Sequence, residues 1–93
     1  MNEFFKVKVF DLKHGLTVYN EIKLVRITSK DYNLLIMVDY LPIIGEFEGN
    51  IDIKGDDVDL SYENIRGFYM NSNNIFNLMI NEEINEWAFR YYN

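Results

Sequence analysis

The sequence predicts an all-β protein: an antiparallel β-sandwich of many short strands, followed by a short C-terminal α-helix. Near the N-terminus Phe5, Val7 and Val9 occupy every second position, and this period of two is typical of a strand with one buried face. Turn-forming residues then recur at intervals of roughly 8 to 12 residues, the spacing of antiparallel sandwiches and barrels. Only the last thirteen residues change to a helical period.

The N-terminal part of the chain predicts two hairpins. Residues 11–15 (DLKHG) have the composition of a turn, and they separate the first strand from an extended run at 16–19. Residues 21–28 (EIKLVRIT) are rich in β-branched side chains that favour strands. A polar corner at 29–33 separates this run from the apolar run 34–38. Each pair of runs therefore predicts a hairpin.

Residues 39–45 contain Pro42, the only proline of the chain. Proline cannot donate a ladder hydrogen bond, so this segment predicts an edge or a loop that covers the core, and not a central strand. Short extended runs follow, separated by the turn sequences Gly-Asp-Asp and Asn-Ser-Asn-Asn. These runs are the remaining predicted strands, at residues 50–54, 58–62, 64–70 and 75–80.

The last thirteen residues predict a helix with one apolar stripe, so we expect a sandwich over residues 1–80 and a helix over 81–93. Asn81 suits the N-cap of this helix. Acids at the next two positions suit its first turn, where the helix dipole favours negative charge. The stripe follows the spacing i, i+3, i+4 and i+7. It consists of Ile84, Trp87, Ala88 and Tyr91.

The composition excludes several classes of function. Nine basic against fifteen acidic side chains give a net charge of −6, which argues against a binder of nucleic acid or of an anionic membrane surface. Without cysteine the chain has no thiolate metal site or cysteine nucleophile, and its one histidine, His14, suits a solvated turn. No nucleophile–base pair or glycine-rich phosphate loop is present. We therefore expect a protein that is not an enzyme and holds no metal and no cofactor.

Two further observations concern location and cation binding. The longest apolar run, at residues 34–38, is far short of the roughly 18 residues of a membrane span, and the N-terminus lacks the apolar stretch of a secretory signal. We expect a cytoplasmic protein that does not insert into a membrane. Clustered carboxylates can bind Ca²⁺, but a solvated hairpin tip is the simpler interpretation, since the alternation of a calcium loop is missing. The carboxylates belong to Asp52, Asp56, Asp57 and Asp59.

In this order the elements resemble the N-terminal β-sandwich domain of the epsilon subunit of rotary F-type ATP synthases. The family's central stretch is a Val-x-Val-Thr strand, a Leu-Gly-Ile strand and a Gly-His-Ala-Pro-Leu-Leu loop. It can be laid without a gap on residues 25–44, where Thr28, Leu34, Ile36 and Pro42 match. The excess of Ile and Asn is typical of AT-rich coding, so an F-type-like ATPase of a minimal AT-rich bacterium fits the resemblance as well.

Later segments are similar to the same family. Gly49 and the strand after it look like the Gly-x-Ile-x-Ile strand, and residues 67–74 look like the Gly-Gly-Phe strand with its Asn-rich turn. The final NEEINEWAFR is similar to the opening of the family's C-terminal helical hairpin, most of which is missing. Where the family's nucleotide site has an acid and an arginine, Asn85 and Ala88 stand here. The resemblance therefore does not imply ATP binding.

The resemblance implies contact regions with other subunits. In the family, the loop matching residues 40–44 faces the gamma-like shaft, and the corner matching 30–33 touches the polar loops of the c-ring. From the residues alone, a cap over the core and an ordinary exposed turn are equally good interpretations of these two segments. The terminal helix either docks on the sandwich or offers a second interface, where aromatic anchors are enriched. The residues are Tyr40, Leu41, Pro42, Ile43 and Ile44 for the shaft, Lys30, Asp31, Tyr32 and Asn33 for the c-ring, and Trp87, Phe89 and Tyr92 for the second interface.

The function implied by the resemblance is that of a non-catalytic rotor subunit of the central stalk. It would bind a gamma-like shaft, and through it alpha- and beta-like ATPase subunits, and transmit rotation without an ATP-sensing inhibitory hairpin. Such a complex places the protein at the inner face of the cell membrane, next to a c-ring where one exists. Two alternatives stay open: an epsilon-like subunit of a paralogous motor not coupled to proton flow, and a free-standing β-sandwich module that binds another protein.

Overall fold

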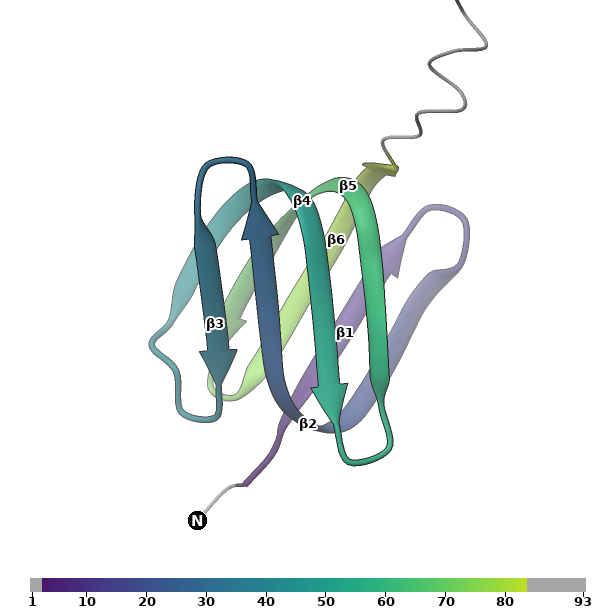
Figure 1. Ribbon diagram of the computed structural model, residues 1–93. Helices are drawn as coiled ribbons and strands as arrows, with labels where there is room; N and C mark the ends of the chain where they lie inside the picture. Colours follow the sequence, from purple (N-terminus) through teal and green to yellow (C-terminus); the bar gives the residue numbers. More distant parts are fainter. Residues whose placement is uncertain (1–2, 84–93) are drawn as a thin grey trace, which may run out of the picture.

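The computed structural model describes residues 3–83, which form six strands and no helix (Figure 1). The strands are β1 (Phe5–Asp11), β2 (Gly15–Ser29), β3 (Asn33–Met37), β4 (Ile43–Gly55), β5 (Asp59–Ser72) and β6 (Ile75–Glu83). Their order is β1-β6-β5-β4-β2-β3, and β1 also pairs with β2. Five strands thus close into a small flattened barrel, and β3 is added outside β2. The prediction of an all-β fold is confirmed.

Three strands are long and bent, so that each runs in both walls of the barrel. β2 bends at Glu21 and β5 at Asn64, which have left-handed φ angles of 58° and 54°. The pairing register shifts at the same places, as it does at a β-bulge, which bends a strand and increases its twist. β4 bends at Gly49, where a Cβ atom would collide with the carbonyl oxygen of Thr28 on β2. Only glycine allows the two strands to approach this closely.

These bends correct the predicted number of strands. The runs at 16–19 and 21–28 belong to the single strand β2, and the runs at 58–62 and 64–70 belong to β5. The residues with left-handed φ angles at these bends are polar, as turn residues are. The sequence pattern therefore indicates the end of a strand at a place where the same strand continues from one wall into the other. The predicted run 50–54 is likewise the second part of β4.

The core fills the space between the two walls. The alternation predicted for the first strand is confirmed, because Phe5, Val7 and Val9 are buried. In the middle of the core, the Tyr69 ring packs against the rings of Phe47 and Phe76 at centroid distances of 6.1 and 5.8 Å. The other buried apolar side chains are Ile22, Val25, Ile27, Ile36, Ile51, Ile53, Ile65, Leu78 and Ile80.

The segment around Pro42 lies where the sequence predicts it. Pro42 precedes β4, which begins at Ile43 and pairs with β5 alone until it reaches Gly49. In this first part β4 is an edge of the rear wall. The prediction of an edge or a loop at residues 39–45 is therefore confirmed.

The C-terminal boundary of the sandwich differs from the prediction. β6 continues to Glu83 by pairing its last residues with Ile65 and Arg66 of β5, so Asn81 lies inside a strand and does not cap a helix. The backbone groups of β5 need partners there, and satisfying them outweighs the local preference of Asn81 for an N-cap. The rest of the predicted helix, including Trp87, Phe89 and Tyr92, lies outside the described residues. Within residues 3–83 no helix is long and apolar enough to cross a membrane.

Candidate protein interface

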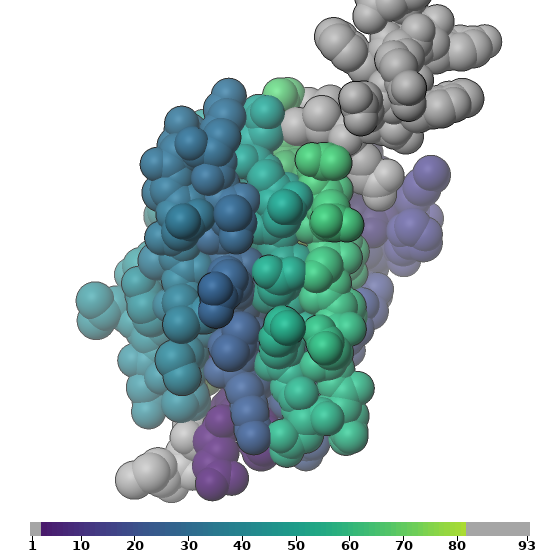
Figure 2. Space-filling model, viewed as in Figure 1, coloured from purple at the N-terminus to yellow at the C-terminus, as the bar shows by residue number. Residues whose placement is uncertain are grey.

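The two walls of the barrel present different outer faces. The wall at the front of Figure 2 is formed by β3 and by parts of β2, β4 and β5, and apart from a few apolar residues at and beside β3 its outward side chains are polar. Ser61 donates a hydrogen bond to Asp52, and Lys54 forms an ion pair with Asp59 at 3.6 Å. Polar groups that pair with one another in this way stay hydrated at little cost. This front face is therefore largely hydrophilic.

The rear wall presents apolar side chains outward. It is formed by β1 and β6 and by the other parts of β2, β4 and β5 (Figure 1). Seven large apolar side chains here are between 38% and 77% exposed, and most of them surround a hollow of about 320 Å³. We call this surface the apolar face. It consists of Phe10, Leu16, Val18, Ile44, Phe68, Met70 and Met79.

The strand register arranges the apolar face in two rows. At the usual strand spacing of about 4.8 Å, the first row extends about 14 Å across the wall and the second row about 19 Å. Contiguous exposed apolar surface of this kind marks an interaction site. The first row is Leu16, Phe10, Met79 and Phe68, and the second is Val18, Lys8, Asn77, Met70 and Ile44.

A charged cluster borders the apolar face beside Phe68. Glu48 accepts from Arg66 at 3.1 Å and lies 3.8 Å from the Lys30 ammonium. Each of these exposed ion pairs contributes at most about 1 kcal/mol to stability. In general, charges at the rim of an interface affect how a partner docks more than they add to affinity.

The corner predicted to meet a c-ring is the turn between β2 and β3. The Ser29 amide closes it by donating to the Tyr32 carbonyl oxygen at 2.8 Å. Lys30, Asp31 and Asn33 are exposed, and a partner can reach all three. The Tyr32 side chain instead turns toward the core. The c-ring contact stays a prediction, and of its four residues only Lys30, Asp31 and Asn33 are exposed enough to make it.

Tyr32 belongs to a partly buried chain of hydrogen-bonded hydroxyl groups. Its hydroxyl donates to the Glu46 carbonyl oxygen at 2.8 Å, so the Tyr69 hydroxyl, 2.9 Å away, must donate to Tyr32. The Tyr69 ring passes over Gly45, where a Cβ atom would collide with it. This chain ties the β2–β3 corner to β4 and β5.

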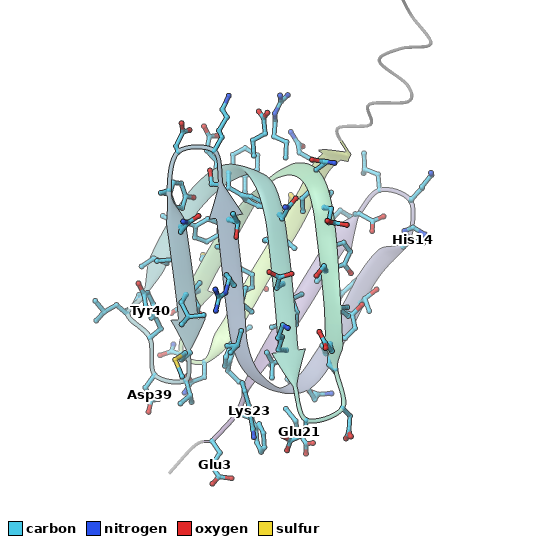
Figure 3. The ribbon with its side chains drawn as sticks, viewed as in Figure 1. Glu3, His14, Glu21, Lys23, Asp39 and Tyr40 are labelled. Carbon is cyan, nitrogen blue, oxygen red and sulfur yellow. The ribbon has the colours of Figure 1, made fainter. Side chains whose placement is uncertain are left out.

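The loop predicted to meet the shaft follows β3 (Figure 3). Tyr40 and Ile43 are half-buried and pack against the core, whereas Leu41 is 72% and Ile44 is 77% exposed. Pro42 is exposed between them. Of the five predicted residues only Ile44 is also part of the apolar face, so the predicted contact loop and the apolar face share one residue.

Hydrogen bonds from the side chains of Asn71 and Asn74 hold this loop in place. The Asp39 amide donates to Asn74 Oδ1 at 2.7 Å, and Asn74 Nδ2 donates back to Asp39 Oδ1 at 2.9 Å. Asn71 Nδ2 donates to the Leu41 carbonyl oxygen at 3.4 Å. These hydrogen bonds attach the loop to β5 and to the β5–β6 turn.

Most of the apolar face was missed by the sequence-based prediction. Its signal is present in Phe68-Tyr69-Met70 and Leu78-Met79-Ile80, where three consecutive residues of a strand are apolar. Neighbouring side chains of a strand point to opposite faces, so such runs indicate a wall that is covered on both sides. Phe10 gives a weaker signal of the same kind.

Two half-buried tyrosines, Tyr32 and Tyr62, predict a loss of stability at high pH. Burial, followed by hydrogen bonds to Tyr69 and Tyr19, raises the pKa of Tyr32 and Tyr62 above the usual value. A raised pKa in the folded state means that their contribution is complete below about pH 10, the pKa of unfolded tyrosine, and is lost as the pH rises further. We expect urea unfolding to show a free energy that falls above about pH 10. The fall should be smaller in the double variant Tyr32→Phe/Tyr62→Phe, and an equal fall in both proteins would contradict this assignment.

Comparison with known proteins identifies the fold. No protein-family model matches the sequence, and no curated protein matches it significantly. A solved structure does: a chain in the cryo-EM structure of the Tetrahymena thermophila mitochondrial ATP synthase, central stalk and c-ring, superposes with a TM-score of 0.67. The two chains share their fold. The superposition covers 98% of this chain and 86% of that chain at 8% sequence identity, so an ATP synthase rotor assembly contains a chain of this architecture.

Proposed function

We propose that this protein is a non-catalytic rotor subunit, similar to epsilon, of an F-type or F-type-like rotary ATPase, and that it binds a gamma-like shaft. The apolar face is the observation that carries the proposal. A wall with buried side chains on one side and large apolar side chains on the other is stabilised when a partner covers it, by about 25 cal/mol for each Å² of apolar surface removed from water. The fold shared with a chain of an ATP synthase central stalk and c-ring structure supports the choice of partner.

The architecture suits a part that passes on a force. Five strands form a closed hydrogen-bonded circuit, through which the barrel would pass on a load that the shaft applies to the apolar face. Through the shaft the protein would be linked to alpha- and beta-like ATPase subunits, which carry the catalysis. The exposed corner at Lys30, Asp31 and Asn33 would face a c-ring or another lower partner. As part of this complex the protein would be cytoplasmic.

The predicted loop can be tested separately from the apolar face. Leu41→Asp changes only the loop, whereas Ile44→Asp changes a residue that both surfaces share. We expect each variant to bind the gamma-like subunit at least about tenfold more weakly in calorimetric titrations, because a charge is then buried in an apolar contact. Their melting temperatures should stay close to that of the wild type, since both side chains are largely exposed.

Leu35→Asp is the matched control for the loop, because Leu35 is an exposed leucine of the front wall. It should leave the affinity for the gamma-like subunit unchanged. If Leu41→Asp also leaves it unchanged while Ile44→Asp weakens it, the loop does not contact the shaft and the apolar face does. Full affinity in both variants would count against the proposed function.

A further inference from the structure

A lysine lies in the middle of the apolar face. Lys8 is half-buried in the second row, between Val18 and Asn77, and it lines the hollow. Within residues 3–83 it forms no ion pair, while Lys23, Lys30 and Lys54 each lie within 4.0 Å of a carboxylate. A partner that covers the face will remove Lys8 from water. Its charge must then be compensated by the partner.

Asn77 adds a second polar group at the same point. β1 and β6 pair in parallel, and Asn77 on β6 lies beside Lys8 on β1. The Asn77 side chain is half-buried and lines the hollow. Its side chain makes no hydrogen bond with any of residues 3–83. The Lys8 ammonium and the Asn77 amide therefore offer adjacent hydrogen-bond donors, and apolar side chains surround both. Register neighbours on adjacent strands lie about 4.8 Å apart, so one acceptor group of a partner would be within reach of both donors.

We propose that the apolar face binds an α-helix of a partner chain that carries one carboxylate in the middle of its apolar stripe, and that this carboxylate accepts hydrogen bonds from Lys8 Nζ and Asn77 Nδ2. The proposal rests on the proposed function in taking this helix to belong to the gamma-like shaft. A carboxylate between the two donors replaces the water that each loses, and charge-assisted hydrogen bonds of this kind are the strong ones.

The strand pairing around Lys8 and Asn77 favours a helical partner. On the rear wall β1, β6 and β5 are each paired on both sides, so an extended segment laid across them would find no backbone partner. An α-helix satisfies its own backbone hydrogen bonds. The width of the face, about 19 Å, corresponds to about 13 residues of helix. Side chains one turn before and after the carboxylate would then reach Val18 and Met70.

A second copy of this chain fits the face less well. Face-to-face packing would bring a second Lys8 and Asn77 to the same surface, and the two rows contain no carboxylate to receive them. Glu46 lies only at the margin, beyond Phe68. A nucleic acid is disfavoured as well, because the face holds a single ammonium group in a chain of net charge −6.

The test uses three designed amphipathic helices of about 18 residues that differ only at the centre of the apolar stripe, which holds Glu, Gln or Lys. Fluorescence anisotropy measures their affinity for the wild type, for Lys8→Met and for Lys6→Met. Lys6 is the matched control because it lies on the same side of β1 and is exposed. We expect the wild type and Lys6→Met to prefer the Glu helix over the Gln helix at least about tenfold and over the Lys helix by more. Lys8→Met, which keeps an apolar stem, should bind the Glu and Gln helices equally.

Several results would overturn the proposal: equal affinities for the three helices, a preference that survives in Lys8→Met, or no binding of any helix. A dimer in sedimentation velocity that Met79→Asp dissociates would assign the face to a second copy instead. Titration with the gamma-like subunit separates the two proposals. If it binds the wild type and Lys8→Met equally well, the rotor role stands and the carboxylate contact fails. If the helices discriminate but the gamma-like subunit does not bind, the carboxylate contact stands and the shaft is the wrong partner.

Discussion

Met79→Asp is expected to weaken binding of the gamma-like subunit about a hundredfold or more. Met79 lies at the centre of the first row, between Phe10 and Phe68, and side chains at the centre of an interface contribute most to affinity. The variant would bury an unpaired carboxylate against apolar side chains, a cost of several kcal/mol. Calorimetric titration measures the loss, and the melting temperature shows whether the fold has survived.

Met37→Asp is the matched control for this prediction. Met37 and Met79 are the same residue type and are equally exposed, each at 50%. Met37 lies on β3, which belongs to the polar front wall. We expect Met37→Asp to retain wild-type affinity, since this face stays in water in the complex. Equal losses of affinity in the two variants would show that the apolar face is not the interface.

Phe76→Ala is expected to produce the largest loss of stability, about 3–5 kcal/mol. Phe76 is fully buried, and its ring stacks on Tyr69 at 5.8 Å with an interplanar angle of 19°. Truncation removes this stacking and leaves a cavity between the two walls. Because domains of this size are stable by only about 5–15 kcal/mol, urea unfolding should show a large shift of the midpoint at an unchanged slope.

Phe68→Ala provides the comparison for the core. Phe68 lies on the outer side of the neighbouring strand and is partly exposed, so its truncation should cost about 1 kcal/mol or less in the isolated protein. The same variant should weaken binding to the shaft, where the Phe68 ring becomes buried. A loss of stability in Phe68→Ala as large as that in Phe76→Ala would mean that the outer face of β5 is part of a core.

The fold class could be predicted from the sequence because alternation is a local property. The period of two in β1 places Phe5, Val7 and Val9 inside without any knowledge of the partner strands. The bends at Glu21 and Asn64 could not be predicted in the same way. A polar residue with positive φ has the same composition at a turn and at a bulge, and only pairing with distant strands decides between them. The end of β6 depended on distant pairing too, because β5 extends the strand past Asn81.

Of the residues of the apolar face, only Ile44, at its border, could be predicted from the sequence. The resemblance to epsilon indicated the loop at residues 40–44, and Ile44 does reach the apolar face. The rest of the face depends on register: Phe10, Met79 and Phe68 are far apart in sequence and become neighbours only through the pairing of β1, β6 and β5. The separate roles of Lys6 and Lys8 are also invisible in sequence, since both are lysines at outward positions. Their different burial appears only when the neighbouring strands are in place.

The most direct test of the rotor assignment is native mass spectrometry of the complex that the full chain forms in its own cells. The account predicts this protein bound to a gamma-like subunit, with alpha- and beta-like subunits in the larger assembly. It also predicts that Met79→Asp releases the protein from that assembly while Met37→Asp does not. A wild-type protein found as a free monomer, or in a complex without any gamma-like subunit, would contradict it.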